Sequence, residues 1–224
     1  MRFSTVCVSL LLSIAVFPGT SDRQDERTLT VPAGPGRPSF TLHVLTKEHQ
    51  GIVEVSSPAG TRSQTLTCDL APFTYFVRAF AIEDMDMDGH PDLRAPREFG
   101  AKFERYCIWL YQPSSRSFER DQLAEQMELL SNLQVDAAHH RLVSNYIGPV
   151  LPSWDVYRIV KGADPRQRLL IPEQTCVIES DASGIVAAIV TRYANGRAQT
   201  ERHEIPGVQG TAQQICDGFG GTGR

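Results

Sequence analysis

An acidic segment in the first half of the chain has the residue types and the spacing of a metal-binding loop. Positions 84–92 read D-M-D-M-D-G-H-P-D, so aspartates alternate with methionines up to a glycine. These carboxylates repel one another at neutral pH, and Ca²⁺ would relieve the repulsion because it binds about six to eight oxygen ligands at about 2.3–2.6 Å. A turn at Gly89 would fold the preceding carboxylates inward. We therefore predict a calcium site formed by Asp84, Asp86, Asp88, the backbone carbonyl of His90, and Asp92, the last directly or through water.

The predicted loop does not follow the EF-hand pattern. An EF-hand carries a bidentate glutamate at position twelve of the loop, and that position is Ala95 here. Phe76–Ile82, which precede the loop, alternate as in a strand and not as in a helix, so we expect the loop to leave a strand. Glu98 could swing in as a late ligand. The alternative is a solvated acidic turn without a metal, since Asp and Gly favour turns.

The sequence contains no recognisable catalytic motif. The patterns of serine hydrolases, zinc proteases, β-lactamases and phosphate-binding loops do not occur. His139 and His140 are adjacent, and adjacent residues of an extended chain point to opposite faces, which disfavours a shared metal. We therefore expect a protein that is not an enzyme. An exported calcium-dependent hydrolase is the alternative, although no set of candidate catalytic residues supports it.

The N-terminal segment predicts export. The chain has 224 residues. Arg2 begins a short basic region, and Val6–Phe17 is an apolar run of signal-peptide length that is too short to span a bilayer. Pro18–Ser21 supply residue types found at cleavage sites. We predict a signal peptide over residues 1–21 and a mature protein that is periplasmic or secreted, without membrane insertion.

Four cysteines remain after this segment: Cys68, Cys107, Cys176 and Cys216. An even number in an exported protein predicts two disulfides. We favour Cys68–Cys107 and Cys176–Cys216 because each pair lies within one half of the chain, with free buried thiols as the alternative. The chain has no C-x-x-C pattern, which argues against a zinc site. The net charge of −4 argues against a nucleic-acid partner.

Hydrophobic periodicity predicts a mainly β protein. Asp121 can cap one short helix over Gln122–Leu130, and Asn195-Gly196 is typical of a type I′ hairpin. We expect an antiparallel β-sandwich or curved sheet with one short helix and a single calcium loop. The predicted organisation is a single β-rich domain over residues 22–217 and a flexible tail over residues 218–224. Predicted strands cover Phe40–Leu45, Gly51–Val55, Gln64–Cys68, Phe76–Ile82, Arg105–Tyr111, Ser117–Arg120, Arg141–Tyr146, Trp154–Val160, Ile185–Tyr193 and Ala198–Ile205.

Between Phe80 and Gly148, several segments occur in a characteristic order. The acidic loop alone is shared by many calcium-binding proteins, and this order distinguishes among them. An aromatic-rich strand follows the acidic loop, and a short helix and another strand come after it. The segments are Glu83–Arg94, Tyr106–Tyr111, Ser117–Glu119, Gln134–Asp136 and Arg141–Ser144.

This region resembles a family of periplasmic immunity proteins, which protect bacteria from lysozyme-like peptidoglycan hydrolases delivered by a type IV secretion system. The family is similar in fold to the periplasmic inhibitor of invertebrate-type lysozyme. The resemblance implies a β-rich, calcium-bound protein whose partner is a lysozyme-like hydrolase and which inhibits it by plugging the active-site cleft. The candidate inhibitory loop contains Ser144 and Tyr146, whose hydroxyls can hydrogen-bond catalytic carboxylates without bearing charge. A calcium-dependent adhesion or glycan-binding module is the alternative.

Overall fold

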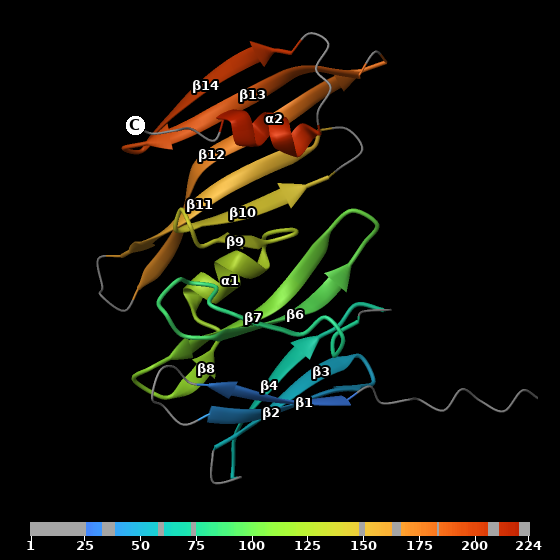
Figure 1. Ribbon diagram of the computed structural model, residues 1–224, viewed down its shortest axis with the longest axis vertical. Helices are drawn as coiled ribbons and strands as arrows, with labels where there is room; N and C mark the ends of the chain where they lie inside the picture. Colours follow the sequence, from blue (N-terminus) through green and yellow to red (C-terminus); the bar gives the residue numbers. More distant parts are fainter. Residues whose placement is uncertain are drawn as a thin grey trace, which may run out of the picture.

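The computed structural model describes residues 26–32, 39–57, 61–72, 75–147, 151–162, 167–182, 184–205 and 211–219. Three antiparallel sheets follow one another along the long axis of the molecule, as Figure 1 shows. The N-terminal sheet lies at the lower end, a second sheet at the middle, and a third sheet at the upper end. This arrangement confirms the predicted mainly β fold. In the described part of the chain, no helix is long and apolar enough to cross a membrane.

The first sheet is a meander in which each strand pairs with the next. Apolar residues alternate with polar ones along its strands, so one face is buried and the other meets water. In the third strand, for example, Val53 and Val55 are buried and Glu54 between them is not. The strands are β1 (Glu26–Pro32), β2 (Ser39–Lys47), β3 (Gln50–Ser56) and β4 (Arg62–Asp69).

The second sheet is built around a strand that is buried on both faces. Cys107, Trp109 and Tyr111 of that strand pack against the first sheet. Ile108 and Leu110 point to the other side, into a second hydrophobic cluster. The continuous apolar run in the sequence is the signature of such a strand. The sheet contains β5 (Ala81–Glu83), β6 (Asp92–Phe99), β7 (Glu104–Gln112) and β8 (Ser117–Glu119), in that order.

The third sheet has six strands, and a helix lies against one of its faces (Figure 1). That helix, α2 (Ala212–Phe219), is joined to the sheet by the disulfide Cys176–Cys216. In order across the sheet, the strands are β14 (Arg197–Glu204), β13 (Gly184–Ala194), β12 (Arg168–Asp181), β11 (Ser153–Lys161), β10 (Arg141–Tyr146) and β9 (Gln134–Asp136).

The helix α1 (Gln122–Glu128) lies between β7 and the third sheet. Asp121 caps it by accepting a hydrogen bond from the backbone N–H of Ala124, as the sequence predicts. Leu123 and Met127 on its inner face are fully buried in the second cluster. The helix therefore joins the middle and upper layers of the molecule.

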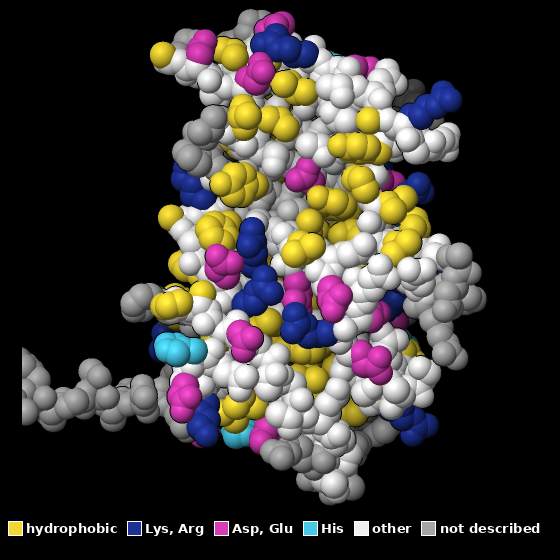
Figure 2. Space-filling view, turned by 180° about the vertical axis from the view of Figure 1, so that it is seen from behind, with side chains coloured by type: hydrophobic (Ala, Val, Ile, Leu, Met, Phe, Trp, Pro, Cys, Tyr) yellow, Lys and Arg dark blue, Asp and Glu magenta, His cyan; other side chains and the backbone are white. Residues whose placement is uncertain are grey.

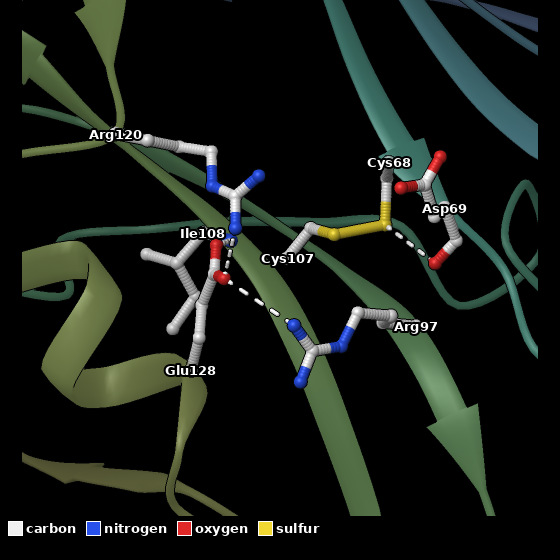
Figure 3. The surroundings of a disulfide bond; sticks show 7 residues. All are labelled: Cys68, Asp69, Arg97, Cys107, Ile108, Arg120 and Glu128. Carbon is white, nitrogen blue, oxygen red and sulfur yellow. Dashed lines mark hydrogen bonds and ion pairs between the residues drawn. A yellow bond between two sulfur atoms is a disulfide. The ribbon is translucent and has the colours of Figure 1, made fainter.

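The predicted disulfide pairs are the ones in the structure. Figure 3 shows Cys68 of β4 bonded to Cys107 of β7, which ties the first two sheets together. Beside it, Glu128 of α1 accepts a hydrogen bond from the N–H of Ile108 and pairs with Arg97 and Arg120.

Several sequence-based boundaries are wrong. The predicted strand over Phe76–Ile82 is mostly a turn, in which the N–H of Ala79 bonds to the carbonyl of Tyr75, and only Ala81–Glu83 pair as a strand. The structure also contains a helix that the sequence analysis does not predict, and this helix ends at Phe219, within the segment predicted as a tail. The signal peptide over residues 1–21 and the tail beyond residue 219 lie outside the described residues.

Candidate metal centre

The acidic segment connects β5 to β6 and brings its first three carboxylates together. One oxygen from each of Asp84, Asp86 and Asp88 lies within 4.8 Å of the others. Oxygens on opposite sides of a Ca²⁺ ion are about 5 Å apart, because each Ca–O bond is about 2.3–2.6 Å long. These three oxygens therefore have a spacing that one calcium ion can bridge. Asp86 is the most enclosed of the three, since its side chain is fully buried.

Side-chain-to-backbone hydrogen bonds hold the loop in this curled shape. The N–H of Asp88 donates to Oδ1 of Asp84 at 3.0 Å and to Oδ1 of Asp86 at 3.1 Å. The N–H of Gly89 donates to Oδ2 of Asp84 at 2.9 Å. Gly89 has a φ of 87°, a conformation that glycine adopts without steric cost. The loop is therefore folded inward at the glycine, as the spacing predicts.

The intervening methionines explain the alternation of the segment. Met85 is fully buried in the cluster that also contains Ile108 and Leu123. Met87 is partly buried against the same cluster. The methionine side chains thus pack into the hydrophobic core, while the side chains of the three aspartates converge on one another.

Asp92 supports the loop from the inside and is not one of the three converging carboxylates. It is fully buried at the start of β6. Its Oδ2 accepts hydrogen bonds from the N–H groups of Met85 and Asp86 at 2.8 and 3.3 Å. Its Oδ1 accepts one from the N–H of Tyr111 at 2.8 Å. Asp92 therefore ties the acidic loop to β7, and burial together with nearby Asp86 raises its pKa to about 8.

The side chains of His90 and Glu98, the other predicted or possible ligand residues, have partners outside the three converging carboxylates. The imidazole of His90 lies beside the ring of Tyr111, with ring centroids 5.5 Å apart. Glu98 lies near the far end of β6, where its Oε2 is 3.5 Å from Nη1 of Arg105. Glu98 is thus engaged away from the loop.

An arginine that the sequence analysis did not identify reaches into the acidic cluster. Arg168, at the start of β12, forms an ion pair with Oδ2 of Asp86 and lies 4.0 Å from Oδ2 of Asp88. Its Nη2 also lies 3.2 Å from Oδ2 of Asp121, the cap of α1. Burial raises the pKa of Asp86 to about 6, and the charge of Arg168 opposes that rise. Arg168 is 82 residues from Asp86 in the sequence, and no local pattern indicates the contact.

The residues present fit a calcium ion. Carboxylate oxygens are the hard ligands that Ca²⁺ prefers, and Asp84, Asp86 and Asp88 would hold the ion. A bound ion would neutralise their mutual repulsion, and it would keep the loop fixed against β7.

The candidate inhibitory residues lie at the end of β10, in different environments. The side chain of Ser144 is buried, and its hydroxyl donates to the carbonyl of Ser131 at 2.9 Å. Tyr146 is 50% exposed. Of the two side chains, the Ser144 hydroxyl is therefore engaged inside the protein and Tyr146 is open to solvent.

A groove of about 470 Å³ opens beside this strand end. Its floor is tied to β10 by Asn132, whose amide donates to the carbonyl of Lys102 and to the carbonyl and side chain of Asn145. Two of the groove's apolar residues are strongly exposed, Phe99 at 50% and Ile147 at 41%. The lining includes Phe99, Lys102, Phe103, Tyr106, Asn132 and Ile147.

Exposed hydrophobic side chains are not confined to this groove. The ring of Tyr75, which is 57% exposed, contacts that of Phe99 with centroids 6.1 Å apart. Figure 2, a view from the side opposite that of Figure 1, shows further hydrophobic side chains gathered over the upper half of the molecule.

His139 and His140 lie in the turn before β10. Nδ1 of His139 is 2.7 Å from Oδ2 of Asp136. This contact belongs to the exposed turn, and in the described chain neither histidine joins the acidic cluster.

Comparisons with known proteins find similarity at the level of structure and not of sequence. No family model and no curated protein sequence matches the chain. A solved structure described as a Xanthomonas type IV secretion system related protein is similar, with a TM-score of 0.48 and 15% sequence identity. The similarity covers 80% of this chain and 94% of the other.

Proposed function

We propose that this protein is an exported calcium-binding inhibitor of a lysozyme-like peptidoglycan hydrolase. The observation that carries the proposal is the acidic loop. Its three carboxylates converge to within 4.8 Å, and Asp92 fastens the same loop to the aromatic strand β7. The same succession of acidic loop, aromatic strand and short helix underlies the resemblance to periplasmic immunity proteins. The two disulfides agree with export, because disulfides persist in oxidising compartments.

In this proposal calcium has a structural role. Asp84, Asp86 and Asp88 hold the ion, and neutralising them fixes the connection between β5 and β6. β6 and β7 supply Arg94, Phe99, Glu104 and Tyr106 to the lining of the groove. A fixed loop therefore keeps this part of the binding surface in one shape. The protein's own side chains then make the contacts with the enzyme.

Tyr146 is the proposed contact with the catalytic carboxylates of the hydrolase. Glycoside hydrolases cleave with a pair of carboxyl groups, and a phenol can donate a hydrogen bond to a carboxylate without bearing charge. Tyr146 is exposed and adjoins Ile147 of the groove. Tyrosine is also enriched among the residues that dominate binding energy. Ser144 contributes indirectly, since its bond to Ser131 holds the strand end that carries Tyr146.

The experiment measures lysis of peptidoglycan by representatives of each lysozyme class, with and without the protein, in buffer containing calcium. We expect tight inhibition of at least one enzyme. The variant Tyr146→Ala should weaken that inhibition about 30-fold, the equivalent of a hot-spot loss of about 2 kcal/mol.

The matched control is Tyr193→Ala, another exposed tyrosine, at the end of β13. It should inhibit as well as the unsubstituted protein. Equal losses of inhibition in the Tyr146 and Tyr193 variants would contradict a specific role for Tyr146. Failure to inhibit any lysozyme-like hydrolase would refute the proposed function, and binding to peptidoglycan without inhibition would favour a glycan-binding module.

A further inference from the structure

Arg168 places its positive charge against carboxylates that a bound cation would neutralise. Its guanidinium contacts Asp86 and lies 4.0 Å from Asp88, two of the three converging carboxylates. Its side chain is only 19% exposed, and the side chain of Asp86 is fully buried. An ion pair in such an enclosed position is screened much less by salt than a surface pair.

The arginine is held on its other side as well. Nη2 of Arg168 is 3.2 Å from Oδ2 of Asp121, whose Oδ1 caps α1. Two residues further along β12, the N–H of Leu170 donates to Oε1 of Gln126 in α1 at 2.9 Å. Arg168 is therefore fixed by β12 and by the start of α1, and it reaches the loop as part of a rigid arrangement.

Both carboxylate oxygens of Asp86 are occupied in this arrangement. Oδ1 accepts the N–H of Asp88, which belongs to the curled shape of the loop. Oδ2 contacts Arg168. An ion that takes Asp86 as a ligand must share or replace one of these contacts. It also gains a positive charge at contact distance from its ligands, which weakens the binding of any divalent cation.

We propose that Arg168 is an internal counter-ion that stabilises the acidic loop when no metal is bound and competes with calcium for Asp86. The inference rests on the proposed calcium role of the loop. It predicts that Arg168 lowers calcium affinity while raising the stability of the calcium-free protein. Calcium binding then loosens the tie between the loop and β12.

The test replaces Arg168 with a neutral side chain of similar length, Arg168→Gln. Calcium affinity is measured by isothermal titration calorimetry, and melting temperature is measured in chelator and in excess calcium. We expect the variant to bind calcium at least tenfold more tightly, to melt at a lower temperature in chelator, and to gain more from calcium than the unsubstituted protein does.

The control is Arg202→Gln, which removes an arginine of β14, the edge strand of the third sheet, that pairs with Glu179 of β12. It should leave calcium affinity unchanged. If Arg168→Gln does not fold in either buffer, the same measurements are made on Arg168→Lys. Lysine lacks the planar fork that spans two carboxylates, so this variant should bind calcium a few-fold more tightly.

Two failures can be told apart. If the unsubstituted protein binds calcium and the Arg168 variants bind it no more tightly, the counter-ion inference alone is overturned. If neither the unsubstituted protein nor the variants bind calcium, the calcium role of the loop fails and the inference fails with it.

Discussion

Loss of one loop carboxylate should remove the response of the protein's stability to calcium. The perturbation is Asp84→Ala. Asp84 is one of the three converging carboxylates and accepts hydrogen bonds from the N–H groups of Asp88 and Gly89, both exposed. Without it the ion loses a charged ligand and the loop loses the two bonds that curl it.

The expected rise in melting temperature with calcium follows from mass action. A ligand present at about 100 times its dissociation constant stabilises the native state by about 2.7 kcal/mol. For a protein of this length, 1 kcal/mol corresponds to about 2–4 °C in melting temperature, so calcium should raise the melting temperature by about 5–11 °C. In chelator the variant should lose at most about 1–3 kcal/mol, because each exposed bond has a net value of about 0.5–1.5 kcal/mol.

The assay is thermal denaturation followed by circular dichroism, in calcium and in chelator, for the unsubstituted protein and the variant. Asp217→Ala is the matched control, because Asp217 is an exposed aspartate on α2. This control variant should show the same rise in melting temperature with calcium as the unsubstituted protein. Identical melting curves of the unsubstituted protein in the two buffers would refute the reasoning.

Other predictions concern pH, packing and covalent links. The pKa values of Asp86 and Asp92 are raised from 3.8 to about 6 and about 8. The stability they contribute is therefore complete below about pH 3.8 and is lost as pH rises through those values, so melting in chelator should occur at lower temperature at pH 8 than at pH 5. Calcium should reduce the part of that decline that comes from Asp86, because it would bind the charged carboxylate of Asp86, and a decline unchanged by calcium would contradict this. Gly51→Ala should destabilise the first sheet by about 1–3 kcal/mol in urea denaturation, because its Cβ would lie 2.3 Å from a buried phenylalanine ring; a loss under 0.5 kcal/mol would be inconsistent with that contact. Replacing Cys176 and Cys216 by alanine should cost about 4 kcal/mol for a loop of 40 residues, and an unchanged urea midpoint would show that the disulfide does not constrain the chain.

The features that the sequence predicts correctly depend on neighbouring residues. Asn195 and Gly196 have φ values of 53° and 73°, as a type I′ turn requires. Asp121 caps the helix that begins at Gln122. The curled acidic loop is local in the same sense, because its hydrogen bonds join residues two to five positions apart. Such signals can be read without knowing the fold.

The features that the sequence does not predict depend on distant contacts. Phe76–Ile82 alternates like a strand, but Phe76 and Phe80 are buried in the core from a turn, not from a strand. Ser144 is buried, and its hydroxyl donates to the carbonyl of Ser131, which lies in another segment.

Arg168 is the clearest case. It lies outside the segments that carry the family resemblance, and its role appears only when β12 is placed beside the acidic loop. A single arginine in a β-strand has no local signature of a counter-ion. Tertiary placement alone reveals it.

The most direct test of the account is the affinity between the protein and a hydrolase that it inhibits, measured by calorimetry in calcium and in chelator. We expect tight binding in calcium, weaker binding in chelator, and a large loss of affinity for Tyr146→Ala in both buffers. Binding that is equally tight in both buffers and unaffected by the Tyr146 substitution would contradict it.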